Sequence, residues 1–257
     1  MATLNLNMQA AQRIRDAVRQ VEKLRQERHA DASLDAAVRS IKRLQGRRFE
    51  GTYSDLLEGG RYQAAARFFL DELYSDRDYA ERDAQFSRIA GAMQKFFPSQ
   101  VVATAVSLAE LHALTEQLDH AMGLAWKGSA DSTGSEMSRY LEAWRSVGRR
   151  RERENQLDVV MGIGVEMAHL TRTPGLRIML KMMRGPASAA GMVPLQRFLE
   201  SGFDTFASLS RQRRGVEEFL ETIRHRESLL IASLFDDDFV ACETRLAHDL
   251  GSCPVSK

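Results

Sequence analysis

The stretch from Arg61 to Pro98 has the densest aromatic content in a chain that is otherwise poor in aromatic residues. Apolar side chains recur there at the i, i+3, i+4, i+7 spacing of one helix face, in two successive runs. Asp78 is placed to cap the second run, and Pro98 is placed to end it. The pattern predicts two helices around one turn, and we expect them to form the core nucleus. The inner positions are Tyr62, Ala65, Ala66, Phe69 and Leu73, then Phe86, Ile89, Ala90, Met93 and Phe97.

Helical periodicity continues through most of the remaining sequence, and no stretch alternates apolar and polar residues as a strand would. Further amphipathic helices are predicted at 6–28, 33–44 (with Ser33 as its cap), 99–126, 135–171, 194–209 and 216–234, with a short one after 238. Connectors are predicted at 46–60, 127–135 and 185–191, where glycine and small polar residues gather. The fold class is therefore all-α, with about eight helices in a single helical-bundle-like body. A globin-like arrangement is an option for its middle part.

We divide the chain into three parts on this basis. Residues 1–30 are expected to form a mobile N-terminal helix, and residues 31–250 the helical body. Residues 251–257 are expected to be a disordered tail. The loops at 127–135 and 185–191 are the two places where the body could be subdivided.

Composition narrows the class of protein but not its function. The 257 residues are 44% hydrophobic and 28% charged, as is ordinary for a soluble globular protein, and a net charge of +1 gives no general attraction to nucleic acid or membrane. No run approaches the ~18 apolar residues of a membrane span, and no secretory signal pattern opens the chain. Cys242 and Cys253 match no zinc or redox spacing. We therefore expect a cytoplasmic protein with reduced thiols.

Two short motifs carry a resemblance to a known family. The first is FFLxxLY at 68–74, followed by Asp78 and Arg82-Asp83; the second is RFLExGF at 197–203, followed by Arg226-Glu227. Together they resemble the signature of a family of uncharacterised bacterial helical proteins, over about residues 46–235. The resemblance implies a helical fold and carries no activity. The two charged pairs are expected to tie helix ends to the core.

Histidines near the middle of the chain raise the possibility of heme. A helix with paired aromatic residues, a second helix and then a helix with candidate axial histidines follow the order found in globins. A neutral imidazole is a suitable iron ligand. In this alternative His120 is the proximal ligand and His112 the second candidate, while Phe68, Phe69 and Tyr74 line the distal side. The protein would then be a sensor that binds heme or another small ligand.

A second alternative is a metal centre like that of ferritin-like oxidases. Glu166 and His169 form one E-x-x-H pair on a predicted helix, whereas such di-iron bundles use two pairs and two further carboxylates. Glu116 lies between His112 and His120 on one helix face and could add a ligand. The competing interpretation is a solvated face on one helix and a hydrogen-bonded histidine on the other.

No motif of an enzyme active site occurs, so catalysis is not expected, although the sequence leaves the question open. The block Arg149–Arg153 is interleaved with glutamates, which is typical of a solvated helix face, and we do not expect a nucleic-acid partner.

A group of methionines fits either a core or an adaptable contact surface. The group consists of Met179, Met182, Met183 and Met192. The leading hypothesis is a non-enzymatic interaction or regulatory protein. It would contact a protein partner or a second copy of the chain through the segment that carries these methionines or through the N-terminal helix.

Overall fold

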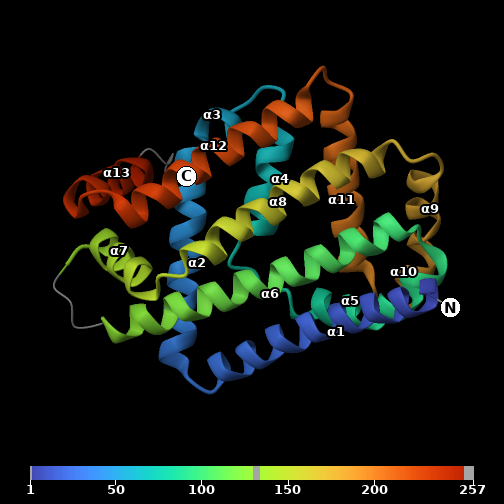
Figure 1. Cartoon of the computed structure of the whole chain (residues 1–257), viewed down its shortest axis with the longest axis horizontal. Coiled ribbons are helices and arrows are strands. Elements are labelled where there is room, and N and C mark those ends of the chain that lie inside the picture. Colours follow the sequence, from blue (N-terminus) through green and yellow to red (C-terminus); the bar gives the residue numbers. More distant parts are fainter. Residues whose placement is uncertain (1, 130–133, 252–257) are drawn as a thin grey trace. The chain divides into compact units, whose positions relative to one another are not determined.

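The computed structural model describes residues 2–129 and 134–251, which form helices α1–α13 and no strand (Figure 1). The helices are α1 (Ala2–His29), α2 (Ala32–Thr52), α3 (Ser54–Leu57), α4 (Gln63–Leu73), α5 (Ala80–Phe96), α6 (Ser99–Gly128), α7 (Glu136–Val147), α8 (Arg150–Thr171), α9 (Leu176–Met182), α10 (Arg184–Ala189), α11 (Val193–Ser210), α12 (Gly215–Asp236) and α13 (Phe239–Gly251). The all-α prediction is confirmed, the predicted number of about eight helices is too low, and a globin-like middle part is not confirmed. None of the helices in this part of the chain combines the length and apolarity needed to cross a bilayer.

One reason for the larger number is that the predicted helix at 135–171 is broken. Gly148 has φ 64° and ψ −116°, and Arg149 also has a positive φ of 55°. Neither conformation continues a right-handed helix, and glycine is the residue that commonly ends one in this way. The chain therefore turns between α7 and α8, directly before the arginine block.

A second reason is that the predicted loop at 185–191 is largely helical. Helix α10 occupies Arg184–Ala189, and Pro186 lies in its first turn, where a missing backbone N–H is tolerated. Alanine, which follows it, has the highest helix propensity. The small residues thus indicated a helix where we expected a loop.

Helix α2 also differs from the prediction at both ends. Asp31, not Ser33, is its N-cap, and its carboxylate accepts hydrogen bonds from the backbone N–H groups of Ser33 and Leu34. The helix continues to Thr52, through residues predicted as a connector. Its additional turns carry Arg48 and Phe49 into the interior.

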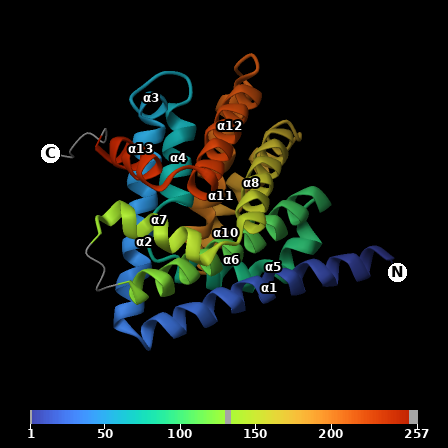
Figure 2. The ribbon, with the colours of Figure 1, turned by 60° about the vertical axis from the view of Figure 1, so that its left-hand side comes forward.

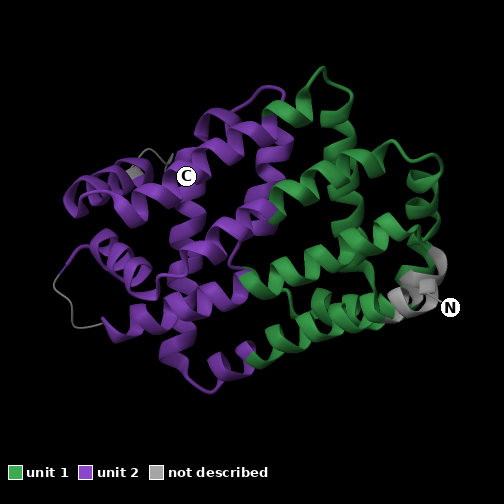
Figure 3. Cartoon of the chain, viewed as in Figure 1, with its two compact units in different colours: residues 1–23, 77–114, 159–218 green, residues 24–76, 115–158, 219–257 purple. Residues whose placement is uncertain are grey.

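The chain divides into two compact units, coloured separately in Figure 3. Unit 1 comprises residues 1–23, 77–114 and 159–218, and unit 2 comprises residues 24–76, 115–158 and 219–257. The divisions fall inside α1, α6, α8 and α12 and between α4 and α5. We expected α4 and α5 to form one core nucleus, but α4 packs with α2 and α3 in unit 2, and α5 packs with α11 in unit 1.

Two apolar clusters are found among the described residues of unit 1. In the first, α1, α5 and α6 pack together through small and β-branched side chains, including Ile14, Val21 and Val102. In the second, Leu170 at the end of α8 packs with α9 and with Phe203 of α11. The apolar line predicted for the N-terminal helix is therefore buried at Ile14, Ala17 and Val21, while its mobility stays a prediction.

Unit 2 is built around the long helix α2. Its buried residues Ala37, Ile41 and Leu44 pack with side chains of α6, α7, α12 and α13. Figure 2 shows α3 and α4 beside α2, where Phe69 of α4 meets Phe219 edge to face at 5.2 Å between ring centroids. Each large apolar side chain buried in this way stabilises the fold by roughly 1.5–3 kcal/mol. The residues of this cluster leave one face of α2 for polar side chains.

Candidate functional site

The polar face of α2 in unit 2 carries three side chains spaced three residues apart, Lys42, Gln45 and Arg48. Each contacts an acidic side chain of another helix. Lys42 pairs with Glu116, Gln45 Nε2 donates to Asp119 Oδ1 at 3.2 Å, and Arg48 Nη1 lies 2.6 Å from Glu227 Oε1. All three carboxylates are buried, so this is a charged interior and not a surface network.

Gly123 allows α6 to approach α2 closely enough for these contacts. A Cβ atom at this position would overlap a methyl group of Val38, which is itself buried. Gly123 follows Glu116 and Asp119 on α6 by seven and four residues, so it lies on the same face of the helix. The close approach therefore sets the distance between the carboxylates and the polar face of α2.

Two buried arginines of unit 2 each form an ion pair with a buried carboxylate. Arg28 Nη1 lies 2.7 Å from Glu116 Oε2, and Arg48 is paired with Glu227. The hydroxyl of Tyr53 also donates to Glu227 Oε1, at 3.0 Å. Burial raises the pKa of the Tyr53 hydroxyl, and the Glu227 carboxylate raises it further. Both arginines thus follow the rule that a buried charge has a hydrogen-bonded partner of opposite sign.

Arg153 is the exception. Its side chain is buried, with the residue 6% exposed, and its Nη2 atom has no hydrogen-bond partner within residues 2–129 and 134–251. Its guanidinium lies over the ring of Trp144, 4.3 Å from the centroid, and the indole Nε1 of Trp144 is also buried without a partner there. A cation–π contact offsets only part of the cost of removing the guanidinium from water. Such buried donors call for an explanation.

The α7–α8 turn brings these two side chains together. Trp144 lies in the last turn of α7, where its carbonyl accepts the N–H of Gly148, and Arg153 lies in the first turn of α8. The left-handed conformation of Arg149 between them costs roughly 1–2 kcal/mol in an L-residue. Helix N-termini also carry a partial positive charge. The guanidinium and the end of α8 therefore favour the same kind of ligand, an anion.

Asp119 is the carboxylate electrostatically coupled to Arg153. Burial raises the pKa of Asp119, while the positive charges of Lys42 and Arg153 oppose that shift. Burial likewise lowers the pKa of Arg153. The buried arginines and the buried carboxylates of this interior are equal in number, three of each, and the half-buried Lys42 adds one positive charge when all are ionised. The basic residues are Arg28, Lys42, Arg48 and Arg153, and the acidic residues are Glu116, Asp119 and Glu227.

We predicted a solvated helix face for the block that contains Arg153, and for Arg153 this prediction is wrong. Part of the block is solvated as predicted, with the ion pair from Arg150 to Glu154 at 3.0 Å. Arg153, however, precedes Leu157 by four residues and the buried Met161 by eight, which places it on the inner stripe of α8. That spacing was the signal that could have identified it.

The residues predicted to bind heme are not all in one unit. His112 is in unit 1, where its Nε2 lies 3.2 Å from Asp83 Oδ2. His120 is in unit 2, where its Nε2 lies 3.3 Å from Glu27 Oε2, and burial lowers its pKa. Phe68 and Phe69 lie on α4 in unit 2, and Tyr74, just after it, stacks on Phe49 at 4.5 Å. Protein side chains thus occupy ring faces that the heme hypothesis assigned to the cofactor, and that hypothesis stays a prediction.

The residues predicted to bind metal are also divided. Glu166 and His169 lie on α8 in unit 1, mostly exposed and 4.0 Å apart at their nearest atoms. Glu116 lies in unit 2, where Arg28 and Lys42 already pair with its two oxygens. Over the described ranges, no three His, Cys, Asp or Glu side chains are arranged to hold a metal ion.

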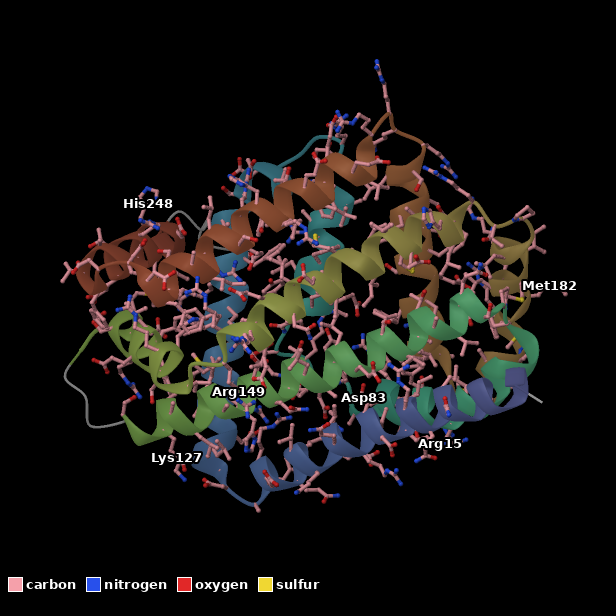
Figure 4. The ribbon with its side chains drawn as sticks, in the orientation of Figure 1. Arg15, Asp83, Lys127, Arg149, Met182 and His248 are labelled. Atoms are coloured by element: carbon pink, nitrogen blue, oxygen red, sulfur yellow. The ribbon has the colours of Figure 1, made fainter. Side chains whose placement is uncertain are left out.

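The charged residues of the two sequence motifs have partners within their own units, but Arg226 and Glu227 lie in the middle of α12 and not at the helix end that we expected. Arg82 lies between the rings of Tyr79 and Phe198, within unit 1. Asp83, labelled in Figure 4, pairs with His112. In unit 2 Arg226 binds Asp55 through two 2.7 Å hydrogen bonds, and its neighbour Glu227 binds Arg48. These residues have structural partners in each case.

Comparison with known proteins gives a family and no activity. No curated protein and no solved structure matches the chain. A family model described as "Domain of unknown function (DUF8198)" matches residues 24–240, which include the whole polar interior described above. The match agrees with the resemblance to a helical family without an assigned activity. The chain therefore belongs to the DUF8198 family.

Proposed function

We propose that this protein is a non-enzymatic regulatory protein whose unit 2 binds a small oxyanion, such as a carboxylate or a phosphate, at Arg153. One observation carries the proposal: Arg153 is a buried arginine with an unpartnered Nη2 donor, whereas Arg28 and Arg48 in the same unit each pair with a carboxylate. A guanidinium presents up to five N–H donors in a plane that matches the oxygens of such anions.

The surroundings of Arg153 support an anion over a neutral ligand. The interior has one positive charge in excess, and the site lies at the N-terminal end of α8. Trp144 adds a second buried donor, its indole N–H, beside the guanidinium. An oxyanion has acceptor oxygens for both donors and a charge opposite to that of Arg153. Binding of this kind needs no reactive group, which agrees with a regulatory role.

Phosphate is expected to stabilise the protein against heat through Arg153. A ligand that binds only the folded state at about 100 times its Kd adds about 2.7 kcal/mol to the free energy of unfolding. Melting would be followed in phosphate and in chloride at equal ionic strength for the wild type, Arg153→Met and Arg151→Gln. Arg151 is an exposed neighbour on the same helix.

Phosphate also stabilises proteins without binding, because it is excluded from their surfaces. That general effect should be equal in all three proteins, so only the difference between them reports the site. The wild type and Arg151→Gln should show the larger shift, and Arg153→Met should show only the general one. Equal shifts in all three proteins, for phosphate and for acetate, would exclude the proposal.

A second candidate function, contact with a partner protein, is favoured by two exposed apolar side chains on α9. Ile178 is 65% exposed and Met182 is 73% exposed, one helical turn apart, whereas Leu176 and Leu180 are buried. Figure 4 shows Met182 pointing away from the other helices of unit 1. This helix lies in the methionine-rich segment suggested by the sequence, and its adaptable side chains would suit the apolar face of a protein partner or of a second copy.

Replacing Ile178 and Met182 together with serine should remove any such contact without unfolding the protein, because both side chains are exposed. The measurement is the mass in solution and the set of proteins retained by the tagged chain. Val240→Ser, at an equally exposed apolar position of unit 2, is the matched control. A strict monomer that retains no partner even as the wild type would count against this function.

A further inference from the structure

Asp119 belongs to the charged interior of unit 2. The residue is only 2% exposed, and its Oδ1 accepts a hydrogen bond from Gln45 Nε2. Charged and titratable groups of four helices act on it electrostatically. They are Lys42 of α2, Glu116 of α6, Tyr140 of α7 and Arg153 of α8.

Asp119 of α6 and Arg153 of α8 lie near each other, because the two helices run in opposite directions (Figure 1) and Gln156 Nε2 donates to Thr115 Oγ1 at 2.7 Å about one turn away from both. An oxyanion bound at Arg153 would therefore place a second negative charge near Asp119. Two buried like charges destabilise each other, and one of them commonly takes up a proton. Arg153 could then give its full charge to the ligand, because Asp119 would be neutral. Neutral Asp119 would also gain an O–H donor, which a carboxylate lacks.

We infer that binding of an oxyanion at Arg153 is coupled to the uptake of one proton from solvent by Asp119, so that unit 2 is a proton-linked anion sensor. The inference rests on the proposed function and specifies how the same site is regulated. No bond is formed or broken other than the O–H bond on Asp119. The ligand class is a small oxyanion that arrives together with one proton.

The direction of the pH dependence follows from the protonation of Asp119 in the free protein and in the complex. Burial has already raised the pKa of Asp119 in the free protein. The bound anion raises the pKa of Asp119 further, so the complex binds more protons than the free protein. Affinity is therefore highest at low pH and falls as pH rises through the two pKa values. For each unit by which the pKa of Asp119 in the complex exceeds its pKa in the free protein, the affinity at high pH is about tenfold lower than the affinity at low pH.

Sulfate is the probe for this test, because it keeps its charge between about pH 5 and about pH 8. Binding to the full chain would be measured by titration calorimetry in two buffers that differ in ionisation enthalpy, which gives the number of protons taken up. The variants are Asp119→Asn and, as matched control, Asp158→Asn. Asp158 is an exposed carboxylate of unit 2 paired with Arg224.

The wild type and Asp158→Asn should take up protons when they bind sulfate. Their affinity for sulfate should fall at least about tenfold as the pH is raised from about 5 to about 8. Asp119→Asn should bind sulfate with no proton uptake and nearly the same affinity at every pH. Sulfate binding to the wild type without proton uptake would overturn the coupling but not the proposed function. If sulfate, phosphate and acetate all fail to bind at any pH, the proposed function falls and the inference falls with it.

Discussion

Replacing Glu227 with alanine is expected to lower the free energy of unfolding by about 3–5 kcal/mol. Glu227 is buried and pairs with Arg48 at 2.6 Å, and its carboxylate also accepts a hydrogen bond from the hydroxyl of Tyr53. Its removal leaves the Arg48 guanidinium and the Tyr53 hydroxyl inside unit 2 without this acceptor. The cost arises mainly from the uncompensated charge of Arg48 and not from the lost attraction. Urea denaturation of the full chain measures it.

Asp158→Ala is the control for this prediction. Asp158 pairs with Arg224 at 2.7 Å, but their side chains are 64% and 50% exposed. Exposed ion pairs of this kind contribute at most about 1 kcal/mol, so the variant should unfold almost as the wild type does. Similar losses from the two substitutions would show that the Arg48–Glu227 pair is solvated, contrary to the structure.

Replacing Arg153 with methionine is expected to stabilise the protein, raising the free energy of unfolding by about 1–3 kcal/mol when no oxyanion is present. Methionine matches the length of the arginine stem and has no N–H donor to leave unpartnered. It also keeps a favourable contact with the Trp144 ring. A residue that lowers stability while it serves a binding site is a common compromise in proteins.

Arg28→Met makes this prediction specific. Arg28 is as well buried as Arg153, but it pairs with Glu116, so the same substitution should destabilise the protein. The difference in sign between the two variants, measured in chloride buffer, reports whether Arg153 lacks the carboxylate partner that Arg28 has. If Arg153→Met lowers stability as much as Arg28→Met does, Arg153 has a partner in the protein and the proposed anion site loses its basis.

The apolar half of the fold could be predicted from the sequence because helix periodicity is local. The inner face expected for α4 is buried at Ala65, Ala66 and Phe69, and that of α12 is buried at Phe219 and Ile223. These positions follow from spacing alone, since a helix in a folded body buries its apolar stripe. The same argument identified Ala17 and Val21 of α1.

The polar interior could not be predicted in this way, because its partners are far apart in sequence. Arg48 and Glu227 are separated by 179 residues, and Lys42 and Glu116 by 74. Periodicity identifies the face on which Arg48 lies, but not the carboxylate that neutralises it. Arg153 illustrates the same limit: its place in a charged block suggested solvent, and only its distance of eight residues from Met161 indicated burial.

The break between α7 and α8 was missed for a different reason. Helical spacing is similar on both sides of Gly148, so the pattern alone predicts one continuous helix. A glycine at the end of an apolar run followed by basic residues is a helix-stop signal, and it should have outweighed the periodicity. The missed turn is also the element that places Trp144 beside Arg153.

A crystal structure of the full chain grown with selenate would show whether the buried guanidinium of Arg153 holds an oxyanion. Selenium scatters anomalously, so the position of the anion can be located without assumptions. We expect a selenate oxygen at hydrogen-bonding distance, about 2.7–3.2 Å, from Arg153 Nη2 in the wild type, and no selenate at this place in Arg153→Met. A structure in which Arg153 instead pairs with a carboxylate of the chain, or extends into solvent, would contradict it.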